Sequence, residues 1–275
     1  MKKLSIIAAW LGTLMCFGMA VQTFASGSFY LTDPRSNRKM LPIENLQNYT
    51  ALWANTSDTC FQSVTLTTQA EVDAFSCVEM VGHLTISCSD ITNLEPLLSL
   101  KTVSSISIFD CDNLANLNGL HSLEALTGIR FSTPVALNIQ DNAILKNIDA
   151  LASLRTISDI YSVSIRIESN PMLKDINGLS GLTSVPNALD IIDNARLENI
   201  DGLKNVVLIG STENALTSSS LRITGNPSLE NLNGLSSLKA IQGRGAALEI
   251  NNNASLLDID ELSSEIYNSM RRRNP

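Results

Sequence analysis

Three carboxylates at or beside equivalent positions of a repeated motif could carry acid–base chemistry. They are Asp141, Glu168 and Asp193, and stacking of the repeats would bring them near one another. Glycoside hydrolysis needs such a pair, with one carboxyl group as general acid and the other as base or nucleophile. A solvated acidic surface is the alternative interpretation, and it is the one that we favour.

Other catalytic signatures do not occur in the sequence. His83 and His121 are the two histidines, and neither has the spacing of a metal ligand. Residues 178–182, GLSGL, fail the spacing of a serine nucleophile turn, and no glycine pattern for nucleotide phosphates is present. We therefore expect a protein that is not an enzyme and that holds no cofactor and no metal.

The cysteines suggest disulfide chemistry. Cys16 lies in an apolar leader, which leaves Cys60, Cys77, Cys88 and Cys111. An even number of cysteines in an exported chain favours disulfide bonds. Cys88 and Cys111 occupy the same position in neighbouring repeats, which would place their backbones about one strand spacing, ~4.8 Å, apart. That separation suits a bridge, and two buried thiols in place of asparagine are the alternative.

The first 25 residues indicate export. Two lysines precede an uncharged apolar run over about residues 4–21, and in residues 23–25, TFA, the first and third supply small side chains at a cleavage point. This arrangement is typical of a secretory signal peptide, although an uncleaved anchor is the alternative because the run approaches the length of a membrane span. We expect a signal peptide at 1–25, an irregular segment at 26–59 and no membrane insertion after cleavage.

The charge of the chain excludes two classes of partner. The formal net charge is −8, and the leader removes two lysines and no acids, so the mature chain is still more acidic. An acidic protein is a poor partner for nucleic acid or an anionic membrane. The basic run at 271–273 lies at a chain end and is typical of a solvated tail.

A repeated motif organises most of the chain. It reads apolar-x-apolar-x-x-Asn, with leucine eight positions after the first apolar residue, Ile or Leu at eleven and leucine at fourteen. The regular copies begin at Leu137, Ile165, Leu189, Leu221 and Leu248. Two upstream variants begin at Leu84 and Ile106 and have cysteine at the Asn position. The sequence thus predicts at least seven stacked coils.

A single coil cannot fold alone. Apolar residues two apart face one side of a strand, and those three apart suit a tight return. About six buried aliphatic side chains contribute roughly 1.5–3 kcal/mol each, whereas ordering the backbone costs about 1–2 kcal/mol per residue. Stability must therefore come from stacking. We predict an α/β, mostly β, solenoid: a right-handed parallel β-helix with short helical caps, in which the Asn side chains bond neighbouring coils as a ladder.

The segment before the first coil resembles the start of a receptor L domain. Residues 60–72, CFQSVTLTTQAEV, lead to Phe75 and Cys77 and then to residues 81–86, VGHLTI. This is similar to the leucine-rich-repeat-like β-helix in the ectodomains of insulin and epidermal growth factor receptors and of related bacterial and fungal surface proteins. The likeness extends over about residues 60–262.

The resemblance implies a solenoid domain at 60–275, a disulfide between Cys60 and Cys77, and a binding role with no particular ligand. No cysteine-rich module or kinase follows, so receptor signalling is not expected. The short leader and the single domain suggest a bacterial member, located in the periplasm, on the cell surface or outside the cell.

Helix signals at both ends of the repeats predict caps. Thr68 and Glu71 form a capping box, which predicts a short helix over the first coil. Leu262, Ile266 and Met270 share one helical face, which predicts a second cap after the last coil.

Two columns of outward residues form the candidate ligand face. The first is Thr85, Ser107, Asn138, Arg166, Asp190, Arg222 and Glu249, and the second is Ser87, Phe109, Gln140, Glu168, Ile192, Thr224 and Asn251. The last four members of the first column alternate in charge, which predicts exposed cross-strand ion pairs worth about 0–1 kcal/mol each. Phe109 and Ile192 are large apolar residues on a polar sheet and are candidate contacts, although single exposed apolar residues are ordinary.

We therefore expect an exported, non-catalytic protein that presents a parallel sheet and one loop-bearing edge to a protein or glycan ligand. The candidate contacts are Phe109, Arg166, Glu168, Asp190, Ile192 and Arg222. The edge loops are the insertions at 127–134, 158–162, 210–219 and 242–246, for which tolerated surface loops are the alternative. A structural envelope component and a β-helix carbohydrate-active enzyme are the alternative functions.

Overall fold

The computed structural model describes residues 58–87, 90–128, 135–158, 163–210, 220–242 and 247–259, positions 262 and 266, and the backbone of 20–23 and 29–32. The chain divides into two units, Met1–Ser57 and Asp58–Pro275. In the first unit, β1 (Ala20–Thr23) pairs antiparallel with β2 (Phe29–Thr32). This pair spans the predicted cleavage point after residue 25, so cleavage there would remove β1.

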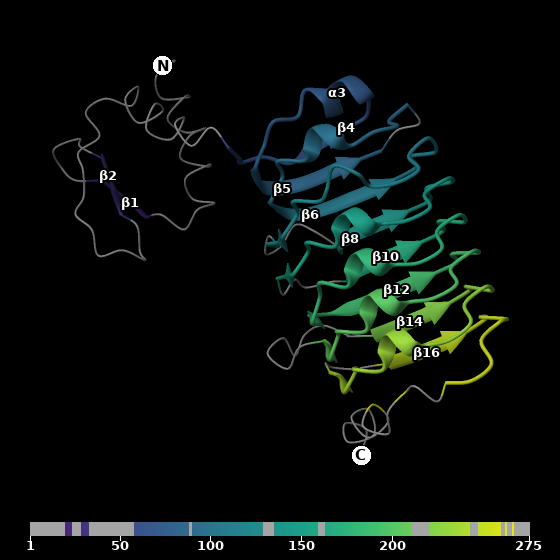
Figure 1. The fold of residues 1–275 in the computed structure, drawn as a ribbon. Coiled ribbons are helices and arrows are strands. Elements are labelled where there is room, and N and C mark those ends of the chain that lie inside the picture. Colours follow the sequence, from purple (N-terminus) through teal and green to yellow (C-terminus); the bar gives the residue numbers. More distant parts are fainter. Residues whose placement is uncertain are drawn as a thin grey trace. The chain divides into compact units, whose positions relative to one another are not determined.

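The second unit is a stack of coils whose main strands form one long parallel sheet (Figure 1). These strands are β3 (Thr59–Cys60), β4 (Val64–Leu66), β5 (Glu79–Ile86), β6 (Thr102–Phe109), β8 (Val135–Gln140), β10 (Val163–Glu168), β12 (Ala188–Ile192), β14 (Ser220–Thr224) and β16 (Ala247–Asn251). Each regular coil adds one strand, and the first apolar residues of the repeats are paired in register from Leu137 through Ile165, Leu189 and Leu221 to Leu248. The predicted mostly β, parallel solenoid is confirmed.

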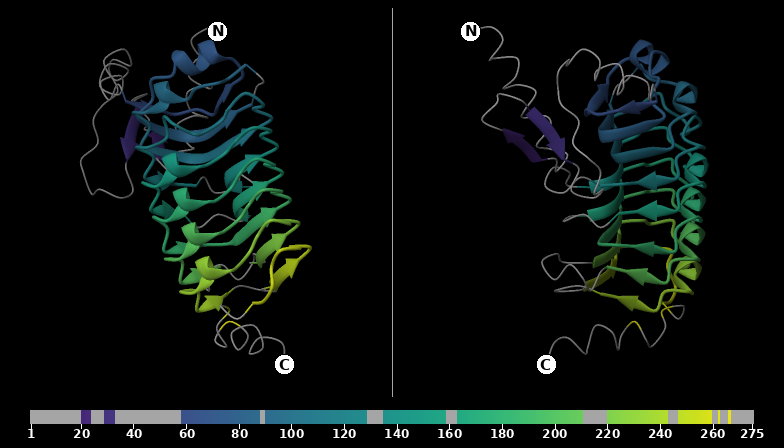
Figure 2. Two further views of the ribbon diagram at one scale, coloured as in Figure 1. Left: turned by 45° about the vertical axis from the view of Figure 1, so that its right-hand side comes forward. Right: turned by 90° about the vertical axis from the view of Figure 1, so that its left-hand side faces the viewer.

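Among the described residues, the coils of β8, β10, β12 and β14 each return through a single 3₁₀ turn and a short second strand, whereas the coil of β5 has only the turn and that of β6 only the short strand. The short strands are β7 (Ala125–Leu126), β9 (Thr156–Ile157), β11 (Ser184–Val185), β13 (Leu208–Ile209) and β15 (Ala240–Ile241). The turns are η1 (Glu95–Leu97), η2 (Asp149–Leu151), η3 (Asn177–Leu179), η4 (Asp201–Leu203) and η5 (Asn233–Leu235), which stack in a row (Figure 2). The spacing of three residues in this part of the repeat therefore corresponds to 3₁₀ geometry, in which residues i and i+3 share one side.

A side chain two positions ahead starts each 3₁₀ turn. An Asn or Asp oxygen accepts from the backbone N–H two residues later, which is the Asx turn that favours this local geometry. The accepting residues are Asn93, Asn147, Asp175, Asn199 and Asn231, and Asn116 makes the same bond in the coil between the first two.

The aliphatic positions of all coils form one core. Leu145, Leu173, Leu197 and Leu229 are fully buried members of a single hydrophobic cluster that extends from Leu66 to Ile266. This is the stacked interior that the repeat offsets predict. Because every coil shares its core with its neighbours, the stability of each depends on the coils above and below it.

The asparagine ladder is present and is completely buried at its centre. The side chain of Asn194 donates to the carbonyls of Ile167 (3.0 Å) and Ile192 (2.9 Å) and to Oδ1 of Asn226 (3.3 Å). Its own Oδ1 accepts from the N–H of Asn170 (3.1 Å) and from the side-chain amide of Asn170 (3.2 Å). The predicted role of these amides, to bond adjacent coils, is confirmed.

The residue before each ladder position turns the chain with a positive φ. Five of these residues are not glycine and have φ of 54–55°: Asp110, Asp141, Ser169, Asp193 and Asn252. Gly225, with φ 70°, takes the same place before Asn226. Asp, Asn and Gly tolerate this left-handed region best, so the residue types before the ladder carry a signal for this turn that the repeat motif does not include.

The N-terminal cap is confirmed. The helix α3 (Gln69–Asp73) begins at Thr68, whose side chain accepts from the N–H of Glu71 while the Glu71 carboxylate accepts from the N–H of Thr68. The Cys60–Cys77 disulfide joins the chain before and after this helix, with Cα atoms 5.8 Å apart. At the other end Leu262 and Ile266 are buried, whereas Met270 lies outside the described residues.

Two other predictions fall partly or wholly outside the described residues. Cys88 is one of them, so its bridge to Cys111 stays a prediction. Cys111 is buried, and its sulfur lies 3.5 Å from the Ile86 carbonyl and 3.4 Å from the Phe109 carbonyl, in the place of a ladder amide. The predicted edge loops lie largely in 129–134, 159–162, 211–219 and 243–246, which are also outside.

Candidate functional site

The strand register brings six of the outward residues together as a central patch on β10, β12 and β14. Arg166, Asp190 and Arg222 are paired neighbours in the first column, and Glu168, Ile192 and Thr224 are paired neighbours in the second. The parallel sheet therefore holds a charged row beside a row of mixed polarity, with the strand backbones fixing both.

Asp190 lies at the centre of this patch and is fully buried. Arg222 donates two hydrogen bonds to the Asp190 carboxylate, from Nε to Oδ1 at 2.9 Å and from Nη2 to Oδ2 at 2.6 Å. Arg166 approaches from the opposite strand, with Nη2 3.6 Å from the same Oδ2. A planar guanidinium matches a carboxylate in this two-point geometry, which makes such pairs stronger than ordinary hydrogen bonds.

The expectation of an exposed ion pair is therefore wrong for Asp190. The side chain of Arg222 is 38% exposed and that of Arg166 is 30% exposed, whereas that of Asp190 is 0% exposed. A buried carboxylate that lost its partner would be left in a medium of low polarity, so breaking this pair costs far more than breaking a surface pair.

The electrostatics of the patch hold Arg222 in its charged form. The hydrogen bonds to Asp190 raise the pKa of the Arg222 guanidinium above its ordinary value, and the nearby charges of Asp190, Glu249 and Glu168 act in the same direction. Burial opposes this shift but does not overcome it. The patch thus presents a permanent cation at its surface.

One polar atom in the patch and one beside it remain without hydrogen bonds in the described structure. They are Oδ1 of Asn138 and Nε of Arg166, both buried. Nε of Arg166 does lie 3.6 Å from the Glu168 carboxylate, which is an ion-pair distance rather than a hydrogen bond. The first column therefore contains one hydrogen-bond acceptor and one donor that make no hydrogen bond within the described residues.

The two apolar contact candidates are not brought together. Phe109 is on β6 and Ile192 is on β12, with β8 and β10 between them. Both are half-buried rather than fully exposed. Ile192 belongs to the central patch and Phe109 does not, so the six predicted contacts form one cluster of five and one separate residue.

The three carboxylates considered for acid–base chemistry, Asp141, Glu168 and Asp193, each contact a different neighbouring residue. Asp141 accepts from the side chain of Gln140 at 2.8 Å, and Glu168 faces Arg166. The Asp193 side chain lies against Gly225, so closely that a Cβ on that residue would overlap its Oδ1. In the described residues no three His, Cys, Asp or Glu side chains are grouped as a metal site.

A histidine and a serine lie in contact near the first coils, which the repeat motif does not predict. Nδ1 of His83 lies 2.7 Å from the Ser105 hydroxyl, and the backbone N–H of His83 donates to the Ser63 hydroxyl at 3.0 Å. Burial lowers the pKa of His83. Ser105 is fully buried, so it is not placed to attack a substrate.

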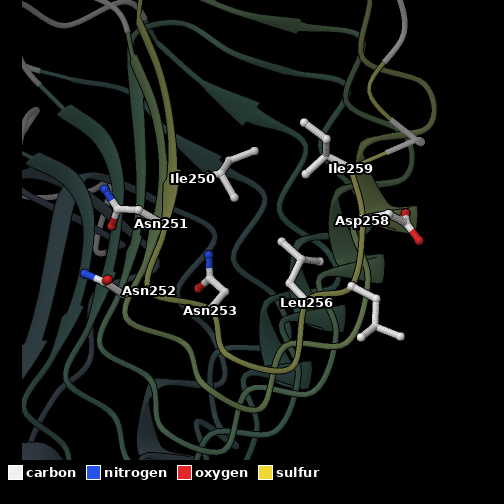
Figure 3. Close-up of a pocket in the computed structure, with 8 residues that line it drawn as sticks. Ile250, Asn251, Asn252, Asn253, Leu256, Asp258 and Ile259 are labelled. Atoms are coloured by element: carbon white, nitrogen blue, oxygen red, sulfur yellow. The ribbon is translucent and has the colours of Figure 1, made fainter.

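A pocket lies at the other end of the solenoid, in the last coil (Figure 3). Its volume is about 310 Å³, and it is lined by Ile250, Asn251, Asn252, Asn253, Leu256, Leu257, Asp258 and Ile259. It lies in the coil that follows β14, and its Asn251 is the strand partner of Thr224 in the central patch. No helix in the described parts of the chain is both long and apolar enough to cross a membrane.

The stacked coils, the single aliphatic core and the buried amide ladder define a repeat protein of the parallel β-solenoid class. Residues 76–177 match the family model described as Receptor L domain. This match supports the resemblance to the receptor L-domain family that the motif at 60–86 predicted. No curated protein matches the chain. The family suggests a repeat domain that binds a ligand, and the Cys60–Cys77 disulfide fits a protein of an oxidising compartment.

Proposed function

We propose that this protein is an exported binding protein without catalytic activity, which holds a protein or glycan ligand against the outward face of its parallel sheet. The central patch is the contact region, with Arg166, Glu168, Asp190, Ile192 and Arg222 as its candidate contacts. Its position on regular strands that are paired on both sides supports this role, because sites on regular strands hold their side chains in place better than sites on loops.

One observation carries the proposal: a fully buried carboxylate positions two arginines that both remain partly exposed. Asp190 accepts from Nε and Nη2 of Arg222 and so fixes the plane of the guanidinium. A guanidinium has five N–H donors, which leaves others free to donate to a ligand. The rotational freedom that an arginine normally loses on binding is already restricted here, which favours affinity.

The chemistry of the patch suits a polar ligand with an apolar edge. Arg166 and Arg222 offer donors, Glu168 offers acceptors, and Ile192 offers a small apolar surface between them. Arginine is enriched among the residues that dominate protein interfaces. A glycan of neutral or mixed polarity would use the same donors and acceptors along successive strands.

The test is binding of the mature protein to an extract of surface proteins and to a glycan array, with Arg222→Gln and Arg166→Gln compared with Arg196→Gln. Arg196 is an exposed arginine on the turn after β12 and serves as the matched control. We expect each patch variant to weaken binding of the identified ligand by about tenfold or more, and the control variant to bind as the wild type does.

The outcomes separate the alternatives. Capture of a specific protein indicates a receptor-like role, and retention on one class of glycan indicates a lectin-like role. Turnover of a bound glycan would contradict the non-catalytic assignment. Unchanged affinity of both patch variants for an identified ligand, with the fold intact by circular dichroism, would remove the central patch from the binding surface.

A further inference from the structure

Three exposed asparagines lie at the same place in three coils, each directly before a glycine. They are Asn118, Asn177 and Asn233, and in each case the next two residues are glycine and leucine. An asparagine in this setting can lose its side-chain nitrogen, because the glycine nitrogen can attack the asparagine Cγ and glycine has no side chain to obstruct it. The three sites share this intrinsic chemistry, so any difference in their reactivity must come from the fold around them.

The fold holds Asn177 and Asn233 in 3₁₀ turns. Each is the first residue of its turn, η3 or η5. Its carbonyl accepts from the backbone N–H three residues later, at 3.0 Å from Ser180 and at 3.1 Å from Ser236. Ring closure requires rotation of the peptide unit between asparagine and glycine, so that the glycine nitrogen faces Cγ. That rotation breaks the hydrogen bond of the turn, so these two sites are protected.

The turn at Asn118 is built differently. Gly119 has φ 113°, whereas residues of a 3₁₀ turn have φ of about −50 to −70°. The N–H of Leu120 donates to the Leu117 carbonyl at 3.1 Å, and no backbone N–H of the described chain donates to the Asn118 carbonyl. The peptide unit between Asn118 and Gly119 can therefore rotate without breaking a backbone–backbone hydrogen bond.

A basic nitrogen lies beside the attacking atom of this site. The residue two places after the glycine is His121 here, whereas it is a serine at the other two sites. The N–H of Gly119 donates to Nδ1 of His121 at 3.4 Å, and an imidazole nitrogen accepts only when it carries no proton. A general base must lie within hydrogen-bond reach of the proton that it removes, and such contacts are often long before the reaction begins.

We propose that Asn118 is a self-modification site, at which the chain converts this asparagine to aspartate and isoaspartate with His121 as general base. Nδ1 of His121 takes the proton from the Gly119 nitrogen as that nitrogen forms a bond to Cγ of Asn118. The bond from Cγ to Nδ2 then breaks, and the imidazolium returns the proton to the departing nitrogen, which leaves as ammonia. Water opens the resulting succinimide ring at either carbonyl carbon. One water is consumed and one ammonia is released, and no oxidant or reductant takes part.

The aspartate product suits the stack of coils. The equivalent residues of the preceding and following coils are Glu95 and Asp149, which are the first residues of η1 and η2. A carboxylate is therefore already accommodated on both sides of Asn118. Deamidation adds a third acidic side chain between them and changes no core or ladder residue. The site lies on the turns rather than on the strands, so it is independent of the proposed ligand site.

The test follows all three sites in one molecule. The full chain is incubated in neutral buffer for weeks and digested, and mass spectrometry quantifies the peptides in which OH has replaced the NH₂ of asparagine. We expect Asn118 to react about tenfold or more faster than Asn177 and Asn233 and to yield both aspartate and isoaspartate. In guanidinium chloride the three rates should converge, because the local sequence Asn-Gly-Leu is the same at each.

A histidine variant isolates the role of the base. We expect His121→Gln to lower the rate at Asn118 in the folded chain by about tenfold or more. The rates at Asn177 and Asn233 should not change, so they serve as controls within the same sample. Far-ultraviolet circular dichroism establishes that the variant is folded, and an Asn118→Asp variant provides the reference peptide for the aspartate product.

Three results would overturn the proposal. Equal rates at the three sites of the folded chain would show that the turn at Asn118 confers no special reactivity. An unchanged rate at Asn118 in folded His121→Gln would show that the imidazole takes no part. Aspartate without isoaspartate would exclude the succinimide, because that ring opens at both carbonyl carbons.

Discussion

Replacement of Asn194 by alanine tests the ladder at a position where it is fully bonded. The side chain takes part in five hydrogen bonds, three as donor and two as acceptor. It is completely buried, so water cannot replace what is lost. Alanine would leave the Ile192 carbonyl and the N–H of Asn170 without these partners inside the protein.

The magnitude follows from the bonds. A hydrogen bond contributes about 0.5–1.5 kcal/mol net, and a buried group left without a partner costs about 1–3 kcal/mol. Two of the five bonds are long, at 3.2 and 3.3 Å, and share atoms with others, so we expect a loss of about 3–5 kcal/mol rather than the full sum. Asn253 takes part in three such bonds and is only half-buried, so Asn253→Ala should cost about 1–2 kcal/mol.

The assay is urea unfolding followed by circular dichroism, with Asn205→Ala as the control. Asn205 is exposed and its side chain makes one bond, to the Ser180 carbonyl at 2.8 Å. We expect the unfolding midpoint to fall in the order Asn205, Asn253, Asn194, with Asn194→Ala lowest. Equal effects of Asn194→Ala and Asn253→Ala would refute the reasoning, because the ladder would then contribute nothing that depends on burial.

The remaining predictions concern packing, pH and the disulfide. Gly202→Ala places a Cβ on the Ile176 carbonyl oxygen and should cost about 1–3 kcal/mol in unfolding free energy; an unchanged urea midpoint would show that the coils can separate. Burial lowers the pKa of His83 below its usual 6.5, so the unfolded chain binds the proton more readily. Stability from this group is full above pH 6.5 and is lost as the pH falls through the folded-state pKa, and His83→Gln should flatten that part of the pH profile of the melting temperature. Reduction of Cys60–Cys77, which closes a loop of 17 residues, should cost about 3 kcal/mol, and equal melting temperatures with and without reductant would contradict this.

The fold was predictable because its determinants repeat at fixed offsets. The apolar residues two and three apart, and the Asn at the sixth position of the motif, each occur in successive coils, so every coil confirms the reading of the others. The N-terminal cap was predictable from Thr68 and Glu71 alone, because a capping box is a local signal. The cap is set by residues close together in the sequence, and the coils are set by a pattern that repeats at fixed offsets.

The burial of Asp190 was not predictable in the same way. The alternation of a strand places it outward, and outward positions are normally exposed. Its burial depends on side chains of the neighbouring strands, above all on how Arg222 folds over it. The pocket in the last coil was also out of reach, because it depends on where the stack ends rather than on any residue pattern.

The left-handed residues before the ladder give a third case. Asp110, Asp141, Asp193 and Asn252 are residue types that tolerate positive φ, and Gly225 replaces them once. The types were visible at a constant offset, yet the same composition also suits an acidic surface or a carboxylate site. The backbone angle separates these interpretations, and it makes the turn the first explanation for these aspartates.

The ladder joins coils of unequal length. Successive bonded asparagines are 28, 24, 32 and 27 residues apart, yet the amide contacts between them are the same at every step. The number of residues in a coil therefore does not change the distance between successive strands of the sheet. A segment of foreign sequence added to one coil away from its ladder and core positions should therefore leave the pitch of the stack unchanged, so the protein could serve as a scaffold for displaying inserted peptides.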